Sequence, residues 1–498
     1  MNVNPITRLD YPDPDVIRVE DTYYMVSTTM HFMPGCEILQ SFDLVHWEHA
    51  TYVYETLDHT DAQQLKSGQN IYGQGMWAAS LRYHEGRFYI CFVANDTRKT
   101  YLYTSEKIDG PWKKQLIEGF YHDGSLLFDE DGRNYIVYGN DEIWITELNE
   151  DLTAPKKDGL HRLLVSDHKN PELGYEGSHI QKINGYYYIF LIHSLRDRWM
   201  RTEACFYSDS LEGEFTGGDV LCDDRGYCGQ GVAQGGIVDT PDGKWYAMLF
   251  QDSGAVGRLP ILLPVTWKDH FPVFGQNGHV PEEIEVHSTR PGYIYQPLVG
   301  SDDFCNGLLP RWQFNHDPDP RYYHLDALQG TYTITTREVC TELTQAVNTL
   351  TQRMSYPSCA AEVTVDASAL KDGDVAGLCA FQGCYAAVGI TKHHGKYEVL
   401  MLDKKEDGIL DMTEGTVVES HQMDFRLEAD FCNMKDEARC YYRVNKGDWL
   451  PIGTVHKLYF KLDHFTGCRF GLFCYAAEET GGSACFRDFK YYDVDEIS

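Results

Sequence analysis

With 498 residues the chain is too long for one hydrophobic core, so two domains are expected. Hydrophobic residues make up 43% of the chain, which suits globular cores. No run approaches the ~18 apolar residues that a membrane-spanning helix needs. The net charge of −32 argues against nucleic acids and anionic membranes as partners, since both would be repelled, but it identifies no partner by itself.

The first fifteen residues and the cysteines bear on the compartment. Residues 1–15 carry prolines and charged residues but no apolar segment of the kind found in secretory signals. The 15 cysteines form no CxxC pair and show no zinc-like spacing. We therefore expect mostly buried free thiols and a cytoplasmic, reducing location.

Strand signals dominate the first 290 residues, and one pattern recurs in them. A tight turn followed by an aromatic pair occurs five times, and the marker tyrosines are Tyr24, Tyr89, Tyr135, Tyr188 and Tyr246. Their spacings of 65, 46, 53 and 58 residues are near the ~50 residues of a four-stranded propeller blade. The repeat predicts a five-bladed β-propeller catalytic domain over residues 1–295.

Equivalent places in these repeats hold acids. Twelve residues before the last four tyrosines stand Trp77, Asp123, Glu176 and Gln234, and eleven before Tyr24 stands Asp13. A single acid of this kind is more often a turn residue that caps a strand end. Three acids at matching offsets favour one shared site, because a radial fold brings its repeats together around one axis.

The three carboxylates suit the hydrolysis of a glycosidic bond. That reaction needs an acid to protonate the leaving oxygen and a carboxylate to activate water or attack the sugar, and a nearby negative charge keeps the acid protonated. Asp13 lies between Pro12 and Pro14, which stiffen its backbone as a positioned base requires. Glu176 has the longer side chain and is the better proton donor.

Other motifs have simpler explanations. Asp129-Glu130-Asp131-Gly132 starts like a calcium loop but lacks the later bidentate Glu, so a hairpin turn is expected. His393-His394-Gly395 is expected to be a solvated hairpin turn rather than a metal site. The segment Met30-His31-Phe32-Met33 is interpreted as a ligand wall, with packing of the first blade as the alternative.

A polar stretch over residues 287–303 suits a linker, and the blade signature is absent after it. Short alternating strands continue to the end of the chain. They predict a second all-β domain, a C-terminal β-sandwich over residues 302–498.

Several motifs together resemble glycoside hydrolase family 43, in order, spacing and chemistry. They are Tyr11-Pro12-Asp13-Pro14-Asp15, Ser41-Phe42-Asp43-Leu44, Trp77-Ala78, His122-Asp123-Gly124-Ser125, Glu176-Gly177-Ser178-His179 and Gly257-Arg258-Leu259-Pro260. The later stretches Ser301-Asp302-Asp303-Phe304 and Trp312-Gln313-Phe314-Asn315-His316 resemble the start of that family's appended β-sandwich, of the jelly-roll, concanavalin-like type.

The resemblance implies roles for individual residues. Asp13 would be the general base, Glu176 the general acid and Asp123 the pKa modulator of an inverting reaction, with acid and base carboxyls about 6.5–9.5 Å apart. Phe32 and Trp77 would form apolar walls against the sugar. Arg258 would bind sugar hydroxyls, hold Asp13 by an ion pair, or do both. A loop of the sandwich can reach the site in relatives, and the sequence does not say which.

One position departs from the family pattern. Many relatives carry a His in the fifth blade, often beside calcium, where this chain reads Ala233-Gln234-Gly235-Gly236. Gln234 is either a ligand of a structural calcium or a hydrogen-bonded plug of the central channel, and the sequence leaves this open. No cofactor is needed for the chemistry itself.

The expected activity is exo-acting release of terminal α-L-arabinofuranose from arabinoxylo-oligosaccharides. The alternative is a β-D-xylosidase or a dual arabinofuranosidase/xylosidase, and the remote alternative is a carbohydrate-binding propeller without catalysis. The expected partners are hemicellulose-derived oligosaccharides, with neither nucleic acid nor membrane. The oligomeric state stays open.

Overall fold

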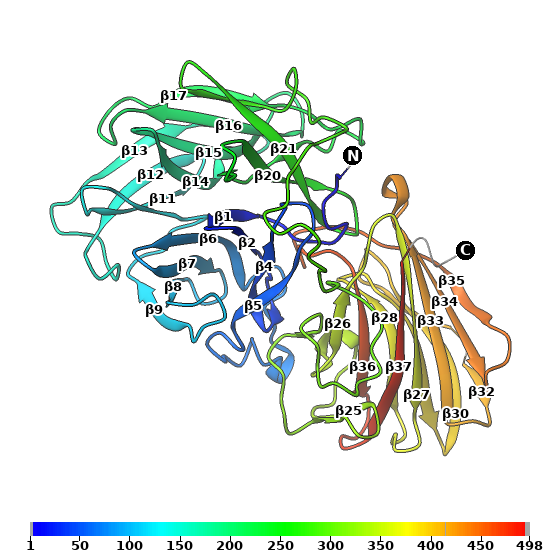
Figure 1. Ribbon diagram of the computed structural model, residues 1–498. Helices are drawn as coiled ribbons and strands as arrows, with labels where there is room; N and C mark the ends of the chain where they lie inside the picture. The colour runs from blue at the N-terminus through cyan, green and yellow to red at the C-terminus, as the bar shows by residue number, and fades with distance from the viewer. Residues whose placement is uncertain (1–2, 414, 494–498) are drawn as a thin grey trace.

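The computed structural model describes residues 3–413 and 415–493, and these ranges are almost entirely β-structure (Figure 1). The helical part of these ranges is three short 3-10 turns, η1 (Lys66–Gly68), η2 (Leu343–Gln345) and η3 (Cys432–Met434). None of the helical segments in the described ranges has the length and apolar character required to cross a membrane.

Five antiparallel sheets form the first domain. The first is built from β1 (Asp15–Val19), β2 (Thr22–Ser27), β4 (Gly35–Ser41) and β5 (Glu48–Tyr54), and the second from β6 (Met76–His84), β7 (Arg87–Ala94), β8 (Lys99–Ser105) and β9 (Lys113–Ile117). The third contains β10 (Ser125–Phe128), β11 (Asn134–Asn140), β12 (Glu142–Leu148) and β13 (His161–Ser166), and the fourth β14 (Glu176–Ile183), β15 (Tyr186–Ser194), β16 (Arg201–Ser208) and β17 (Thr216–Leu221). The fifth contains β18 (Val232–Ala233), β19 (Ile237–Asp239), β20 (Trp245–Asp252), β21 (Arg258–Lys268) and β22 (Phe271–Phe274).

These sheets are the blades of the expected five-bladed propeller, which is confirmed. Each marker tyrosine lies on the strand that follows the first turn of its blade, and these strands are β2, β7, β11, β15 and β20. The turns at Asn184-Gly185 and Glu85-Gly86 adopt positive φ at both residues, as two-residue hairpins require. The repeat in the sequence is therefore the repeat of the hairpin between the first two strands of each blade.

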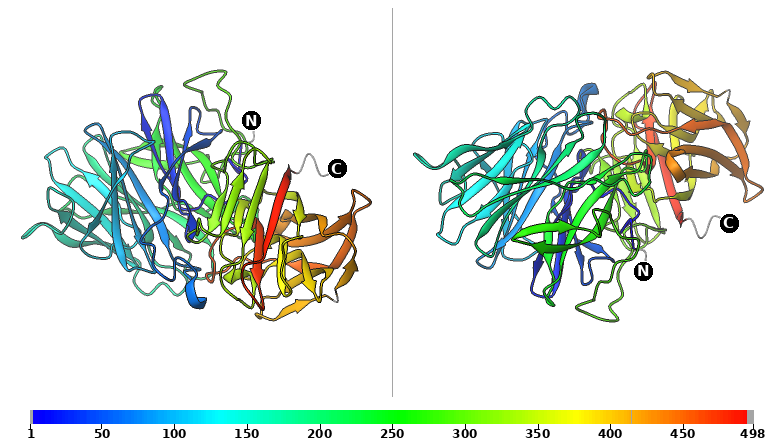
Figure 2. Two further views of the ribbon diagram at one scale, coloured as in Figure 1. Left: turned by 90° about the horizontal axis from the view of Figure 1, so that it is seen from below. Right: turned by 90° about the horizontal axis from the view of Figure 1, so that it is seen from above.

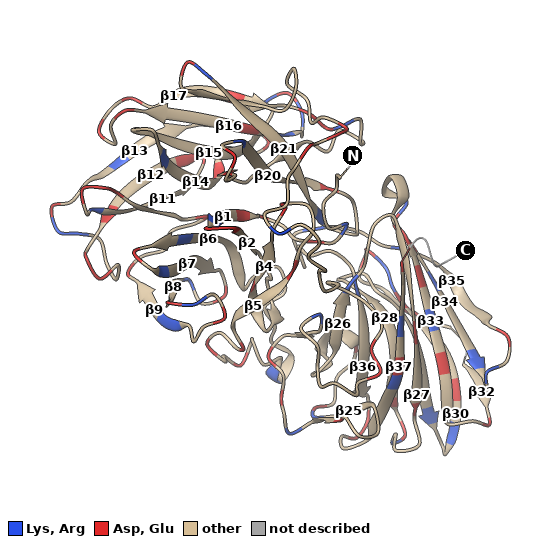
Figure 3. Cartoon of the chain, viewed as in Figure 1, with Lys and Arg blue, Asp and Glu red and all other residues tan. Residues whose placement is uncertain are grey.

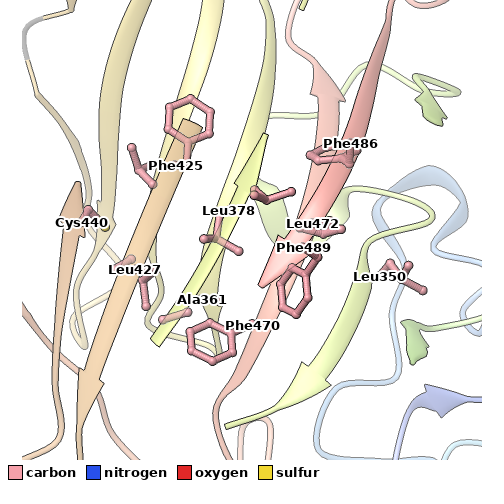
Figure 4. Close-up of a cluster of buried hydrophobic side chains, with 14 of the residues drawn as sticks. Leu350, Ala361, Leu378, Phe425, Leu427, Cys440, Phe470, Leu472, Phe486 and Phe489 are labelled. Atoms are coloured by element: carbon pink, nitrogen blue, oxygen red, sulfur yellow. The ribbon is translucent and has the colours of Figure 1, made fainter. Parts of the chain in front are cut away.

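Two further sheets form the second domain, the expected concanavalin-like β-sandwich. The larger contains β23 (Gln313–Asn315), β26 (Leu350–Arg353), β28 (Asp374–Phe381), β29 (Ala386–His393), β30 (Lys396–Lys404), β31 (Leu410–Met412), β32 (Thr416–Val418) and β36 (Arg469–Ala476). The smaller contains β24 (Tyr323–Asp326), β25 (Thr331–Thr335), β27 (Ser358–Asp366), β33 (Gln422–Asp430), β34 (Glu437–Val444), β35 (Leu450–Lys457) and β37 (Ser483–Asp493). Figure 4 shows side chains of both sheets, such as Leu378 and Phe425, in the core between them.

The two domains share a strand pairing. The short strand β3 (Phe32–Met33), which belongs to the first blade by sequence, pairs with β23 and so extends the larger sheet of the sandwich. The views in Figure 2 show the sandwich beside the propeller on the side of this first blade. Because β3 pairs with β23, the domain contact is part of the hydrogen-bonded framework.

Acidic and basic residues are spread over both domains (Figure 3).

A buried ion pair also joins the domains. Arg353 of the sandwich lies 2.8 Å from Glu37 of the first blade, and both side chains are at most 4% exposed. Its guanidinium also stacks on Tyr11, 4.0 Å from the ring centroid, and donates to the Asp10 carbonyl. Burial raises the pKa of Glu37, but Arg353 and His49 outweigh it and hold that pKa below its usual value.

We expect Arg353→Met to lower the free energy of unfolding by about 3–5 kcal/mol, because it leaves the buried Glu37 carboxylate without its ion-pair partner. Chemical denaturation at neutral pH measures this loss. The control is Arg290→Met, which breaks the exposed ion pair with Asp21 and should cost at most about 1 kcal/mol. Equal effects of the two substitutions would contradict the assigned role of burial.

Candidate active site

The three acids from the sequence analysis lie at corresponding places in three blades. Asp13 comes just before β1, Asp123 just before β10, and Glu176 is the first residue of β14. These strands are the first of their blades, so their starts face the same end of the propeller axis. The amide of Gly177, next to Glu176, donates to Asp123, and burial together with the charges of Glu176 and Asp13 raises the pKa of Asp123.

The backbone is strained where these strands begin. Asp13 and Asp123 adopt φ values of 52° and 47°, in the left-handed region that residues with a side chain seldom occupy. Gln234, at the corresponding place in the fifth blade, has φ of 61°. Strain of this kind persists where surrounding contacts over-determine it, and it is typical of functional sites.

Asp13 is held on both carboxylate oxygens. The Thr28 hydroxyl donates to Oδ2 at 2.6 Å, and Arg258 donates from Nη1 to Oδ1 at 3.0 Å. The Thr28 hydroxyl is itself oriented by the amide of Ala78 on the neighbouring blade. The Asp13 side chain is 8% exposed and the Arg258 side chain 2% exposed. Asp13 is thus a fixed, nearly dry carboxylate next to a permanent positive charge.

Glu176 is the most accessible of the three acids. Its side chain is 19% exposed, against 6% for Asp123. The Asn140 amide donates to Glu176 Oε2 at 2.7 Å, and His122 Nε2 lies 3.4 Å from the same oxygen. The carboxyl is therefore oriented on one side and open on the other, as a group that meets a ligand must be.

Asp123 is the acid of the site whose pKa is raised. Its Oδ2 accepts the amide of Gly177 at 3.0 Å, and its buried Oδ1 makes no hydrogen bond within the described residues. Burial, together with the charges of Glu176 and Asp13, raises the pKa of Asp123 to about 6, against the opposing effect of His122. A proton held among these crowded acids is what a general acid needs.

His122 is a site residue that the sequence analysis quoted but assigned no role. The charge of Asp123, with that of Glu176, raises the pKa of His122 to about 9 even though burial opposes it. The imidazole is therefore a cation at neutral pH and partly offsets the charge of the two acids. The sequence signal that could have identified His122 as a site residue is its position directly before Asp123.

An aromatic residue of the sandwich completes the site. Phe465, in the segment between β35 and β36, lies 5.4 Å from Trp77 between ring centroids and 4.1 Å from the Arg258 guanidinium. Trp77 also approaches His122 at 6.3 Å. The segment is anchored on both sides of Phe465, since His464 stacks on Tyr72 at 4.0 Å and the Gly467 amide donates to Asp10. The sandwich loop that reaches the site, which the sequence left unspecified, is therefore the segment between β35 and β36.

The expectation that Phe32 is a wall of the sugar site is wrong. Phe32 is 1% exposed, pairs with the sandwich through β3, and lies under the Arg469 guanidinium at 3.4 Å. Its ring therefore has no surface left for a ligand. Met30 of the same segment is the residue that bridges to Met76, the neighbour of Trp77.

Gln234 packs beside the acids, because a Cβ placed on Gly177 would lie only 2.8 Å from its side chain. Its side-chain amide makes no hydrogen bond to other described residues. The backbone N–H of Gln234 donates to the Glu203 carboxyl at 2.7 Å, and burial raises the pKa of Glu203 well above its usual value. Within the described ranges the only candidate group of three or more ligating side chains is His122, Asp123 and Glu176. A structural calcium at Gln234 stays a prediction.

Glu203 gives a prediction about stability. It is fully buried, and its Oε1 has no partner in the part of the chain that the structure describes. Because its folded pKa is raised, its contribution is most favourable below the unfolded pKa and is lost as pH rises. We expect Glu203→Gln to stabilise the protein by about 1–3 kcal/mol at pH 7 and to lose this advantage near pH 4.

Thermal and urea unfolding of both proteins between pH 4 and pH 8 measures this difference. The control, Glu147→Gln, removes an acid whose pKa is lowered, despite burial, by Lys156 and by the Leu160 amide, so its effect should have the opposite pH trend. A difference for Glu203→Gln that does not change with pH would contradict the prediction.

Comparisons with known proteins match both domains of the chain. The model of glycosyl hydrolases family 43 matches residues 3–272, and that of the β-xylosidase C-terminal concanavalin A-like domain matches residues 301–492. A β-xylosidase of Formosa agariphila is 26% identical, over 99% of this chain and 89% of its own. A xylosidase/arabinosidase of Butyrivibrio fibrisolvens is 24% identical over 99% of both chains.

A solved structure is more similar still. A bifunctional GH43-CE protein of Bacteroides eggerthii is 42% identical over 99% of this chain, with a TM-score of 0.92, and this chain spans 64% of its length. The family model covers more than half of the chain and includes all three acids. The chain belongs to glycosyl hydrolases family 43.

Proposed function

We propose that the protein is an exo-acting, inverting hydrolase that removes a terminal α-L-arabinofuranose from arabinoxylo-oligosaccharides. The observation that supports this proposal is that the three acids have different environments. One carboxyl is fixed and nearly dry, one is accessible, and a third lies beside both with its pKa raised. No cofactor takes part in this chemistry.

In this mechanism Asp13 takes a proton from a water molecule as the water oxygen attacks the anomeric carbon. Glu176 gives its proton to the glycosidic oxygen as the bond to the anomeric carbon breaks. The Arg258 ion pair keeps Asp13 in one orientation, and Asp123 keeps a proton available for Glu176. The base ends protonated and the acid ends ionised, and exchange with water restores both.

Two aromatic residues, Trp77 and Phe465, support action on a terminal sugar. Trp77 and Phe465 approach each other beside the acids, and Phe465 comes from the other domain. A sandwich loop across this side of the site limits how far a polymer can continue beyond the bound sugar. The partly exposed face of Trp77 offers the apolar surface that sugar rings prefer.

A second candidate activity is that of a β-D-xylosidase, alone or combined with arabinose release. It is favoured by the names of the Formosa relative, a β-xylosidase, and the Butyrivibrio relative, a xylosidase/arabinosidase. Gln234 is a candidate contact for either sugar. Its side-chain amide lies beside Gly177 and can both donate to and accept from a sugar hydroxyl.

Initial rates on 4-nitrophenyl α-L-arabinofuranoside and 4-nitrophenyl β-D-xyloside test the proposal. We expect faster release from the arabinoside, and free arabinose as the sugar released from arabinoxylo-oligosaccharides. Faster release from the xyloside would favour the second candidate. Release of oligosaccharides from the chain interior, or binding without turnover, would contradict the exo-hydrolase assignment.

A further inference from the structure

The three side chains around the acid Glu176 form a group with metal-ligating chemistry. His122 Nε2 lies 3.5 Å from Asp123 Oδ2 and 3.4 Å from Glu176 Oε2. One ligating atom from each residue lies within 4.8 Å of the others. A charge-assisted N–H···O hydrogen bond is normally about 2.7–2.9 Å long, so the hydrogen bond between His122 and Glu176 is a long one, and His122 and Asp123 form an ion pair without a hydrogen bond.

We propose that His122, Asp123 and Glu176 bind one Zn²⁺ ion, and that the bound ion blocks hydrolysis. The second half of this inference rests on the proposed function, in which Glu176 is the proton donor. The first half, the metal site itself, depends only on the residues present.

The spacing of the group agrees with a tetrahedral ion. Zinc binds His nitrogen at about 2.0–2.1 Å and carboxylate oxygen at about 2.0–2.2 Å, so two ligand atoms of a tetrahedron are about 3.3 Å apart. Both measured distances from His122 Nε2 are within about 0.2 Å of that edge. Two edges of the group therefore already match a tetrahedral ion, and the ligating atoms of all three residues lie within 4.8 Å of one another.

The ligands are already oriented by other groups. The Gly177 amide fixes Asp123 Oδ2, and the Asn140 amide fixes Glu176 Oε2. Outer contacts of this kind set ligand orientation in metal sites. The second oxygen of Asp123, Oδ1, is buried without a hydrogen-bond partner in the described chain, and Asp123 as a residue is only 6% exposed. That oxygen is an unsatisfied acceptor within the proposed ligand group.

The donor set selects the class of ion. One imidazole and two carboxylates suit Zn²⁺ and its borderline neighbours, whereas Ca²⁺ takes six or more oxygens and Mg²⁺ demands octahedral oxygen geometry. The side chains of His122 and Glu176 are 21% and 19% exposed, which leaves an entry path and an open fourth position for water.

Zinc would block proton delivery by Glu176 and would compete with the sugar. A bound ion occupies Oε2 of Glu176, so the carboxyl cannot deliver a proton to the leaving oxygen. A ligand sugar beside Glu176 should weaken zinc binding by the same factor that zinc weakens sugar binding.

Titration calorimetry with ZnCl₂, and the visible absorption of Co²⁺ as a tetrahedral probe, test the site without an activity assay. We expect one equivalent of metal on the full-length protein and a tetrahedral Co²⁺ spectrum. His122→Gln should weaken binding at least tenfold, as should Asp123→Asn, and unfolding curves check that both variants fold. The double variant His393→Gln/His394→Gln removes a surface histidine pair at a hairpin turn and should bind like the wild type.

Initial rates with and without ZnCl₂ test the inhibition, which we expect to be competitive with substrate and reversed by EDTA. Absence of metal binding in an active enzyme would overturn the inference and leave the proposed function intact. Binding that is lost in the His393/His394 variant but kept in His122→Gln would overturn the site. Binding at His122 without loss of activity would overturn the blocking step and the assignment of Glu176 as acid.

Discussion

Asp13→Asn is expected to lower kcat by about 10³–10⁴-fold while the protein keeps its fold. Asparagine has the same shape but cannot accept a proton from the attacking water. Arg258 can still donate to the carbonyl oxygen of the asparagine, and the Thr28 hydroxyl can turn to accept from its amide nitrogen, so the side chain should stay in place. Initial rates on the two nitrophenyl glycosides, with a thermal unfolding curve for each protein, measure the change.

The matched control is Asp21→Asn, which removes an exposed acid of the first blade, paired with Arg290. We expect its rates to stay within about twofold of the wild type, because exposed ion pairs contribute little. Activity of Asp13→Asn close to that of the control would show that another group activates water. Loss of fold in Asp13→Asn would instead make Asp13 a structural partner of Arg258.

The blades could be predicted from the sequence because each contributes the same local feature. The turn before Tyr135 or Tyr246 is a two-strand hairpin that short-range rules describe, and its repetition gives the count of blades. The acids could be placed for the same reason, because their offset from the tyrosine is fixed by the length of the strand between them. Local spacing was enough for both.

Contacts between the domains could not be predicted in this way. Phe465 reaches Trp77 from a distant part of the chain, and no local pattern marks the loop that carries it. Phe32 reads as a residue of the first blade, yet its strand pairs with β23 and leaves the site. An aromatic residue on a short strand can face either side of that strand, and only the partner domain decides which side is covered.

Glu176→Gln is expected to affect substrates according to their leaving group. On arabinoxylo-oligosaccharides, whose leaving group is a poorly acidic sugar hydroxyl, we expect kcat/KM to fall about 10²–10⁴-fold. On 4-nitrophenyl glycosides the loss should be much smaller, because nitrophenolate departs without a proton. The alkaline limb of the pH profile should also disappear, since that limb reports ionisation of the essential acid.

This difference separates acid catalysis from simple damage to the site. The Asn140 amide can still donate to the carbonyl oxygen of the introduced glutamine side chain, and a misplaced side chain would slow both substrates equally. The control is Asn140→Asp, which keeps the acid but places a second negative charge beside it, where the Asn140 amide now lies 2.7 Å from Glu176 Oε2. A carboxylate there should raise the pKa of Glu176 and shift the alkaline limb upward without the leaving-group dependence. Equal losses on both substrates in Glu176→Gln would remove Glu176 as the proton donor and leave Asp123, whose pKa is already raised by its burial and its neighbours, as the remaining acid able to serve.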